Sequence, residues 1–193
     1  MPGDPVTMPP MPSRVPAGAT PEGDGIALGD GPVRVDAFID FLCPYCRRFE
    51  QSSGPGLATM LAEHRITLAY HPMNFLDQAS TTRYSTRAAA ASGCAADSGR
   101  FLEYTHVLFV NQPPEGSAGL SDSELGALAS EAGLPAQPFA NCLGEGLYLD
   151  WPPYVTARAA AAGVGATPTV LVAGVPVPAD SEAIARAVDQ VSI

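Results

Sequence analysis

Short apolar runs lie near both ends of the chain, and apolar residues recur at helical spacing through its middle. The run over residues 33–41 predicts a buried strand, and the alternating segment over residues 66–71 predicts a second one. Residues 26–28 predict a short strand before them, and residues 169–173 and 175–177 predict two more close to the C-terminus. The predicted strands therefore fall into two groups, with a long section between them.

Helical patterns fill that section and also follow the strands. Ser121 and Glu124 match a capping box, and Asp180 or Ser181 is placed to cap the last helix. Gly and Pro at residues 53–56 predict a break in the first helix. The predicted helices cover residues 44–63, 79–96, 98–110, 121–132, 136–143 and 147–162, and a final one ends near residue 191.

This order of elements predicts an α/β protein with a thioredoxin fold and an inserted all-helical subdomain. A β-α-β half comes first and a β-β-α half last, so residues 25–76 and 163–193 would form the thioredoxin-like domain. Residues 77–162 would form the helical insertion. Residues 1–24 are rich in Pro, Gly and polar side chains, and we expect them to be a flexible tether.

Composition narrows the possible partners. Twenty acidic residues face ten arginines and no lysine, which gives a net charge of −10 and argues against binding to nucleic acid or to an anionic membrane surface. No apolar run approaches the roughly 18 residues of a membrane span. The first 21 residues hold seven prolines and no apolar segment of the kind found in signal peptides.

Cys43 and Cys46 form a Cys-x-x-Cys motif where the predicted strand meets the first helix. Backbone N–H groups without partners and the positive end of the helix dipole favour a thiolate at the first cysteine, and Pro44 suits the first helical position. A structural disulfide would close only a small loop, and a zinc knuckle lacks a second ligand pair. The motif therefore predicts a redox-active dithiol, and we expect no metal.

Cys94 and Cys142 are the other two cysteines, and both lie in helical surroundings. They could be two buried free thiols, which proteins tolerate well. Alternatively, they could form a structural disulfide closing a loop of about 49 residues, worth roughly 4 kcal/mol. The even number of cysteines favours the disulfide, and such a bond persists in an oxidising compartment.

Three segments of the sequence resemble the DsbA-like thiol:disulfide oxidoreductases of bacterial cell envelopes. They are FIDFLCPYC at residues 38–46, QPPEGSAGLSD at residues 112–122 and GATPTV at residues 165–170. The resemblance implies that Cys43 is an exposed nucleophile and Cys46 its buried partner. It also implies a cis bond between Thr167 and Pro168, facing the dithiol, and no cofactor beyond the redox-active disulfide.

Two positions depart from the pattern of this family. Tyr45 stands where strong oxidants often carry His, so we expect a milder oxidant, with Arg47 as the neighbouring cation that favours the Cys43 thiolate. Ala37 stands where many thioredoxin-fold enzymes have an acidic proton acceptor. Asp40, or a water molecule, would take that part, because Asp36 should point to the other face of the strand.

Together these features predict a dithiol oxidase that introduces disulfides into exported proteins. The alternatives are a disulfide isomerase or reductase on the same fold, or a non-catalytic peptide-binding or chaperone module. Its partners would be reduced or unfolded exported polypeptides and a membrane reoxidase of the DsbB-like or vitamin K epoxide reductase-like kind. We expect a monomer in the cell envelope or secreted, whose export signal or membrane anchor has been removed.

Overall fold

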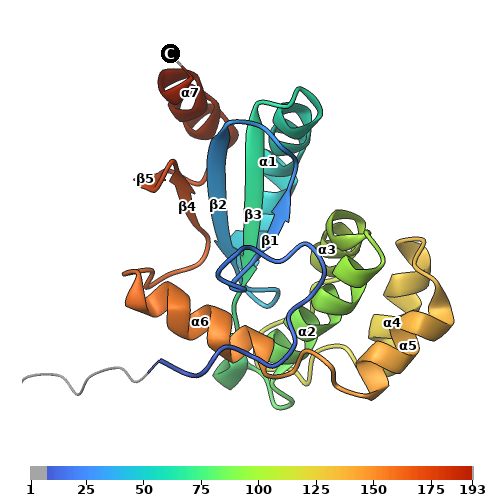
Figure 1. Ribbon diagram of the computed structural model, residues 1–193. Coiled ribbons are helices and arrows are strands. Elements are labelled where there is room, and N and C mark those ends of the chain that lie inside the picture. The colour runs from blue at the N-terminus through green and yellow to red at the C-terminus, as the bar shows by residue number, and fades with distance from the viewer. Residues whose placement is uncertain (1–7, 193) are drawn as a thin grey trace, which may run out of the picture.

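A computed structural model describes residues 8–192 and contains one mixed sheet of five strands (Figure 1). The strand order is β1-β3-β2-β4-β5. Strands β2 and β3 run parallel, and the other neighbouring pairs are antiparallel. The strands are β1 (Ile26–Leu28), β2 (Val33–Ile39), β3 (Ile66–Pro72), β4 (Thr169–Val172) and β5 (Val175–Val177).

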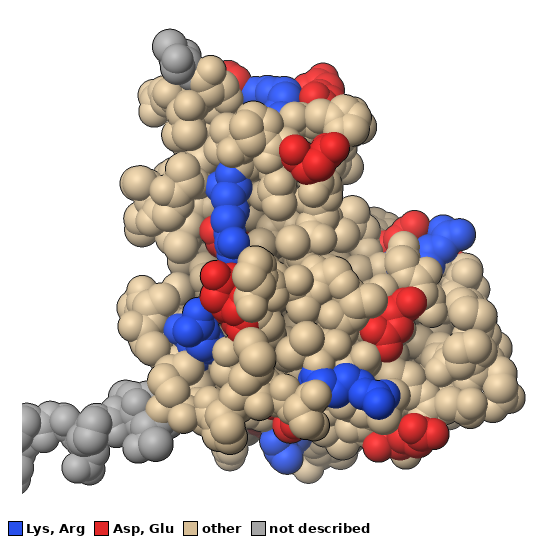
Figure 2. All heavy atoms as spheres, in the orientation of Figure 1, with Lys and Arg blue, Asp and Glu red and all other residues tan. Residues whose placement is uncertain are grey.

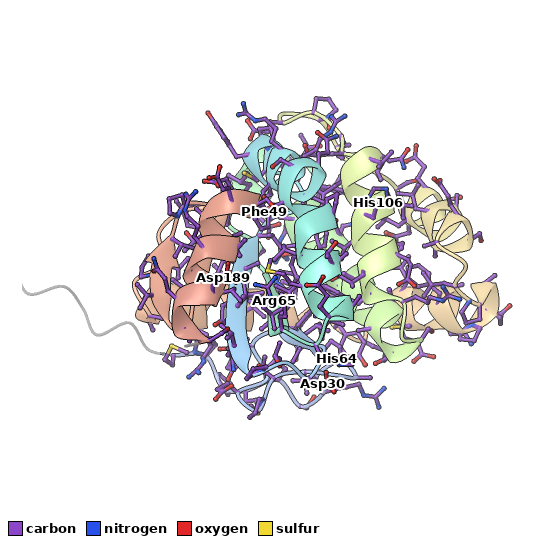
Figure 3. The ribbon with its side chains drawn as sticks, turned by 90° about the horizontal axis from the view of Figure 1, so that it is seen from above. Asp30, Phe49, His64, Arg65, His106 and Asp189 are labelled. Atoms are coloured by element: carbon purple, nitrogen blue, oxygen red, sulfur yellow. A yellow bond between two sulfur atoms is a disulfide. The ribbon has the colours of Figure 1, made fainter. Side chains whose placement is uncertain are left out.

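Helices cover both faces of this sheet. The long helix α1 packs beside α7 on one face, whereas α6 lies against the other. Seen from above in Figure 3, α1 lies between α7 and α3, and Arg65 after its C-terminal end pairs with Asp189 of α7. The helices are α1 (Pro44–Ala62), the 3₁₀ turn η1 (Asp77–Ala79), α2 (Tyr84–Asp97), α3 (Phe101–Val110), α4 (Asp122–Glu131), α5 (Ala136–Gly144), α6 (Trp151–Ala161) and α7 (Ser181–Val191).

This is the element order that the sequence predicts, with η1 to α6 inserted between β3 and β4. The capping box at Ser121 and Glu124 is formed at the start of α4, and Asp180 caps α7. Four helices begin later than predicted, namely α2, α3, α4 and α6. In α2, for example, the Ser80 hydroxyl accepts the N–H of Tyr84, so the residues before Tyr84 form a turn instead of the helix.

The predicted break in the first helix is wrong. Helix α1 is continuous and holds Pro55 in its interior. Proline removes one backbone donor, and the carbonyl that loses its partner belongs to the exposed Gln51, where water can bind it. Gly56 has a packing role, because a Cβ there would lie 2.3 Å from the Ser181 Oγ at the start of α7.

The predicted tether is also wrong over residues 16–24, which pack against the folded protein. The indole N–H of Trp151 donates to the carbonyl of Gly23 at 2.8 Å, and the Tyr154 hydroxyl donates to the carbonyl of Glu22. Ala19 forms a β-bridge with Ile26, which covers the edge of the sheet. Backbone carbonyls of this segment thus accept hydrogen bonds from the aromatic side chains of α6. Residues 1–7 of the predicted tether lie outside the described residues.

Candidate active site

The Cys-x-x-Cys turn lies where β2 gives way to α1. Strand β2 ends at Ile39, two residues earlier than predicted, because the backbone turns at Asp40, whose carbonyl accepts the N–H of Cys43. Cys43 is the N-cap residue of α1, and Pro44 occupies the first helical position. Cys46 follows in the first turn, so both thiols lie at the N-terminal end of a 19-residue helix.

The two thiols differ in accessibility less than expected. Cys46 is 0% exposed, and Cys43, which the resemblance implied to be exposed, is only 4% exposed. Tyr45 between them is 62% exposed. The resemblance therefore overstated the exposure of Cys43, which is buried as the N-cap residue of α1.

The loop before β4 faces the dithiol. The Thr167–Pro168 peptide bond is cis, and the Cys43 thiol lies 3.4 Å from the carbonyl oxygen of Thr167. The fold thus brings Cys43 to a loop 124 residues further along the chain. Thr167 can offer main-chain hydrogen bonds to an extended peptide that reaches this sulfur.

The surroundings of Cys43 favour its thiolate. Its pKa falls from 9.0 to about 6, chiefly because the Cys46 thiol donates a hydrogen bond, with smaller contributions from Thr167 and the backbone N–H groups of Cys46 and Tyr45. Burial acts in the opposite direction. The shift corresponds to about 4 kcal/mol in favour of the thiolate. Burial and the neighbouring Cys43 raise the pKa of Cys46, which therefore keeps its proton.

Arg47 was expected to favour the thiolate, but the main groups that lower the pKa of Cys43 include no arginine. Its side chain is half-buried and borders a hollow beside the turn, and its Nε is buried without a hydrogen-bond partner among the described residues. Arg48 stacks on the Tyr45 ring instead, with the guanidinium carbon 4.4 Å from the ring centroid.

Asp40 is 0% exposed and joins the dithiol to the helical insertion. Its backbone N–H points to the Cys46 sulfur at 3.4 Å. Its carboxylate accepts hydrogen bonds from the Ser85 hydroxyl at 2.6 Å, the Leu42 N–H at 2.9 Å and the Leu76 N–H at 2.8 Å. Burial raises its pKa to about 6 despite these donors. Three donors thus bind the carboxylate of Asp40, and Asp40 contacts Cys46 only through its main chain.

Gln112 supports the same turn from the loop after α3. Its side-chain amide donates to the carbonyl of Phe41 at 2.9 Å and to that of Cys43 at 3.0 Å. Both carbonyls flank Leu42, so one side chain fixes the path of the backbone into the N-cap position. Sequence reasoning missed this role and that of Ser85. Gln112 opened one of the segments that carried the family resemblance, but nothing in the sequence signals Ser85.

Asp36 lies away from the dithiol, as expected from strand alternation. Its carboxylate pairs with Arg34 and with Nε2 of His71 at 2.9 Å, and the His71 ring stacks on Phe38. These groups face α6, on the side of the sheet opposite α1. Ala37 points to the α1 side and offers no acid, so the only carboxylate that binds the catalytic turn in the described part of the chain is that of Asp40.

Comparison with known proteins assigns this site to a family. The family Thioredoxin_4, described as thioredoxin, matches residues 23–190. The solved structure of reduced DsbG from Mycobacterium tuberculosis, titled a disulfide bond oxidoreductase, is 31% identical with a TM-score of 0.78, over 90% of this chain and 89% of that one. The chain belongs to the DsbA-like thiol:disulfide oxidoreductases of the thioredoxin fold. Reduced DsbA from the same organism is 30% identical with a TM-score of 0.70, over 85% of this chain and 99% of that one.

A curated relative shares part of the sequence. Serine/threonine-protein kinase PknE of Mycobacterium tuberculosis (strain H37Rv) is 36% identical over 133 residues, and the match covers 64% of this chain. The chain spans only 23% of the length of that relative. The match therefore concerns one section of PknE and adds nothing on the activity of this DsbA-like chain.

These comparisons confirm the predicted fold class and the predicted enzyme class. The DsbA-like chain is a thiol:disulfide oxidoreductase with Cys43 and Cys46 as its Cys-x-x-Cys pair. No helix among residues 8–192 is long and apolar enough to span a membrane. No group of three or more His, Cys, Asp or Glu side chains in that part of the chain is arranged to hold a metal ion.

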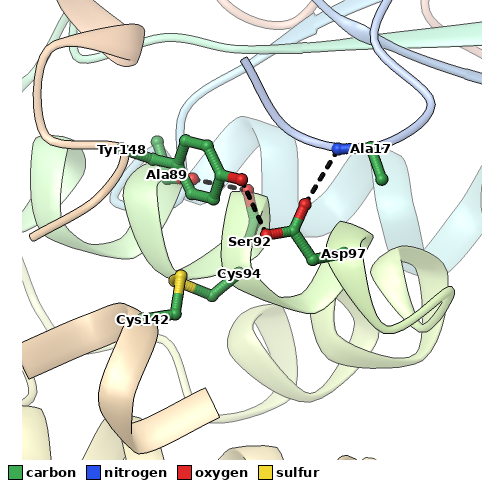
Figure 4. The surroundings of a disulfide bond; sticks show 7 residues. All are labelled: Ala17, Ala89, Ser92, Cys94, Asp97, Cys142 and Tyr148. Atoms are coloured by element: carbon green, nitrogen blue, oxygen red, sulfur yellow. Dashed lines mark hydrogen bonds between the residues drawn. A yellow bond between two sulfur atoms is a disulfide. The ribbon is translucent and has the colours of Figure 1, made fainter. Parts of the chain in front are cut away.

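The other two cysteines of the DsbA-like chain form a disulfide outside this site. A disulfide links Cys94 of α2 to Cys142 of α5, with 5.9 Å between the Cα atoms (Figure 4). Nearby, Asp97 at the end of α2 accepts hydrogen bonds from the Tyr148 hydroxyl at 2.6 Å and from the Ala17 N–H at 2.9 Å. The disulfide therefore sits in a junction that also fixes the N-terminal segment.

Replacing Asp40 with Asn is expected to change how stability depends on pH. A buried acid whose pKa rises to about 6 on folding stabilises the native state most below its unfolded value of 3.8, and this contribution is lost as pH rises through 6. The difference in unfolding free energy between wild type and D40N should therefore fall by about 3 kcal/mol between pH 4 and pH 7. Urea titrations across this range measure that difference.

Ser85→Ala is the matched control for this experiment. It removes one donor that lowers the pKa of Asp40 but keeps the acid, so the change in stability should persist and move to higher pH. If wild type and D40N differ by a constant free energy from pH 4 to pH 7, Asp40 does not titrate in this range.

Proposed function

We propose that this enzyme is a dithiol oxidase that transfers its Cys43–Cys46 disulfide to reduced polypeptides. The observation that carries the proposal is the contrast between the thiols of the reduced site. The pKa of Cys43 is lowered to about 6 while that of Cys46 is raised, so the reduced site holds one thiolate and one thiol at neutral pH. Stabilising the thiolate stabilises the reduced form, and a disulfide whose reduced form is stabilised is a stronger oxidant.

The reaction would proceed through two exchanges. A substrate thiolate attacks Cys43 of the enzyme disulfide, forms a mixed disulfide with it and releases Cys46, which takes up a proton. The second substrate thiolate then attacks the substrate sulfur of the mixed disulfide, and Cys43 leaves as a thiolate. Two electrons pass to the enzyme and one disulfide forms in the substrate. The low pKa of Cys43 favours the second exchange, because a stable thiolate leaves faster.

Exposed apolar side chains close to the dithiol in sequence or contact suit an unfolded chain. Tyr45 is 62% exposed and Phe75 is 47% exposed. Phe75 precedes Leu76, whose N–H donates to the Asp40 carboxylate. Val110, just before the Gln112 loop, is 49% exposed. Exposed apolar side chains of this size are typical of binding surfaces, and the main chain of Thr167 lies within reach of the same sulfur.

The disulfide between Cys94 and Cys142 supports an extracytoplasmic location, because structural disulfides persist in oxidising compartments. There the substrates would be exported polypeptides that arrive reduced. Each turnover leaves the dithiol reduced, so the cycle needs a reoxidant, for which we propose a membrane reoxidase of the DsbB-like or vitamin K epoxide reductase-like kind. We propose that the enzyme acts as a monomer.

Two assays test this function. The oxidised enzyme should form disulfides in reduced, unfolded ribonuclease A at a stoichiometry of one disulfide per enzyme. Equilibration with glutathione should give a reduction potential between about −120 and −200 mV, the range of oxidants and isomerases. A potential near −270 mV, as in thioredoxin, would indicate a reductase instead. Faster reshuffling of scrambled ribonuclease A than oxidation of the reduced protein would indicate an isomerase.

A further inference from the structure

Within residues 8–192, seven of the ten arginines of this acidic chain are paired with carboxylates, but Arg14 and the two that follow Cys46 are not. Opposite charges lie next to each other over the face shown in Figure 2. Among the described residues, no carboxylate lies within 4.0 Å of the guanidinium of Arg47 or Arg48. The arginines that do form such pairs are Arg34, Arg65, Arg83, Arg87, Arg100, Arg158 and Arg186.

Arg47 borders a hollow of about 340 Å³ beside the catalytic turn. Leu42 and Pro44 line it on the side of the catalytic turn, and residues 112–115 line it on the side of the insertion. Since Leu42 and Pro44 are the two neighbours of Cys43, a side chain in this hollow would lie within one or two residues of a substrate cysteine bonded to Cys43.

The helix directs Arg47 into this place. Its N–H donates to the carbonyl of Cys43, one turn back, and helical side chains lean towards the N-terminus of their helix. The stem is half-buried, yet Nε is fully buried and has no partner among residues 8–192. A ligand in the hollow therefore meets Arg47 through the terminal nitrogens of its guanidinium. Arg47 is also not among the main groups that lower the pKa of Cys43.

We propose that this hollow is a subsite for a carboxylate side chain, Asp or Glu, close to the reactive cysteine of the substrate polypeptide. This inference rests on the proposed function and adds a substrate preference to it. The planar guanidinium of Arg47 can donate two parallel hydrogen bonds from its terminal nitrogens to a carboxylate, whereas Nε is buried out of reach of a ligand. The apolar walls formed by Leu42, Pro44 and the Pro113–Pro114 pair would shield that ion pair from water.

Glu115 lines the same hollow and weakens the preference for a carboxylate. It is exposed and forms no ion pair with Arg47, so its charge opposes that of a bound carboxylate without occupying the guanidinium. Removing the charge of Glu115 should therefore strengthen the preference, whereas removing that of Arg47 should abolish it.

Matched peptides test the subsite. Each carries two cysteines, with either Glu or Gln at one of the two positions before or after the first cysteine. For the best position, oxidation of the Glu peptide by wild type should have a kcat/KM about fivefold above that of the Gln peptide. The ratio should fall to about 1 in R47Q and should rise in E115Q. R48Q is the control, since Arg48 stacks on Tyr45 and should leave the ratio unchanged.

The outcomes separate this inference from the proposed function. In R47Q the Gln peptide should be oxidised at the wild-type rate, which shows an intact dithiol, and 0.5 M NaCl should reduce the wild-type preference. Equal kcat/KM for the Glu and Gln peptides at every position, or a preference that persists in R47Q, overturns the subsite. If neither peptide is oxidised, the proposed function fails. In that case the subsite is tested by binding of the same peptides with serine in place of cysteine. Equal Kd values for the Glu and Gln forms overturn the subsite independently of the proposed function.

Discussion

Replacing Cys43 with Ser is expected to reduce disulfide exchange by at least about 1,000-fold, because no covalent intermediate can form. Cys46 cannot take over the reaction. It is 0% exposed, and its raised pKa keeps it as a thiol at neutral pH. The measurement is the rate of disulfide formation in a reduced model protein, with unchanged circular dichroism as the check on folding.

Cys46→Ala is the informative companion to this variant. It leaves Cys43 as the single free thiol of the chain, since Cys94 and Cys142 are joined. It also removes the hydrogen bond that contributes most to the low pKa of Cys43. Thiolate absorbance at 240 nm should therefore titrate with a pKa above 6, towards 9.0. A midpoint unchanged from wild type would mean that the helix terminus alone stabilises the thiolate.

The same variant should also trap substrates. Without Cys46, a mixed disulfide on Cys43 cannot revert to the enzyme disulfide, so covalent complexes with reduced polypeptides that carry a single cysteine, and hence no second thiol to displace Cys43, should accumulate under oxidising conditions. They should be visible as slower bands on non-reducing gels and absent with Cys43→Ser. If C43S retains oxidation activity, Cys43 is not the nucleophile and the assignment of roles is wrong.

Local patterns were enough to predict the order of elements and the reactive turn. An apolar strand run, a Cys-x-x-Cys and a helical pattern occur within about thirty residues, and each depends on neighbours close in sequence. The features that were predicted wrongly or missed depend on contacts across the fold. Pro55 stays inside α1 because the helix packs along its whole length, and residues 16–24 are ordered by donors on α6 that lie about 130 residues away.

The surroundings of the dithiol show the same division. Asp40 was a candidate because it lies near Ala37, which stands where many thioredoxin-fold enzymes have an acid, but its partners Leu76 and Ser85 come from elements whose position only the fold determines. Arg47 was assigned to the thiolate because it is next to Cys46. In the helix its side chain points to the Gln112 loop instead, which no spacing in the sequence indicates.

Removing the disulfide between Cys94 and Cys142 should have the largest effect on stability. The two residues are 48 apart, and closing a loop of this length in the unfolded chain is worth about 4 kcal/mol. The double variant C94A/C142A should therefore unfold at a urea concentration lower by roughly 1 to 2 M. Measuring it in a background of C43S and C46S avoids any change in the active-site disulfide.

The position of this bond also predicts which part of the molecule is affected. It joins α2 to α5, near the hydrogen bonds through which Asp97 holds Tyr148 and Ala17 (Figure 4), whereas Cys43 belongs to the junction of β2 and α1. Amide hydrogen exchange should therefore increase over α2 to α5 and stay low in β2 and β3. With Cys43 and Cys46 present, the pKa of Cys43 in C94A/C142A should equal that of wild type. A changed pKa of Cys43 would mean that the disulfide supports the dithiol through Ser85 and Asp40. A loss of protection spread evenly over the sheet would mean that the insertion and the thioredoxin half unfold as one unit.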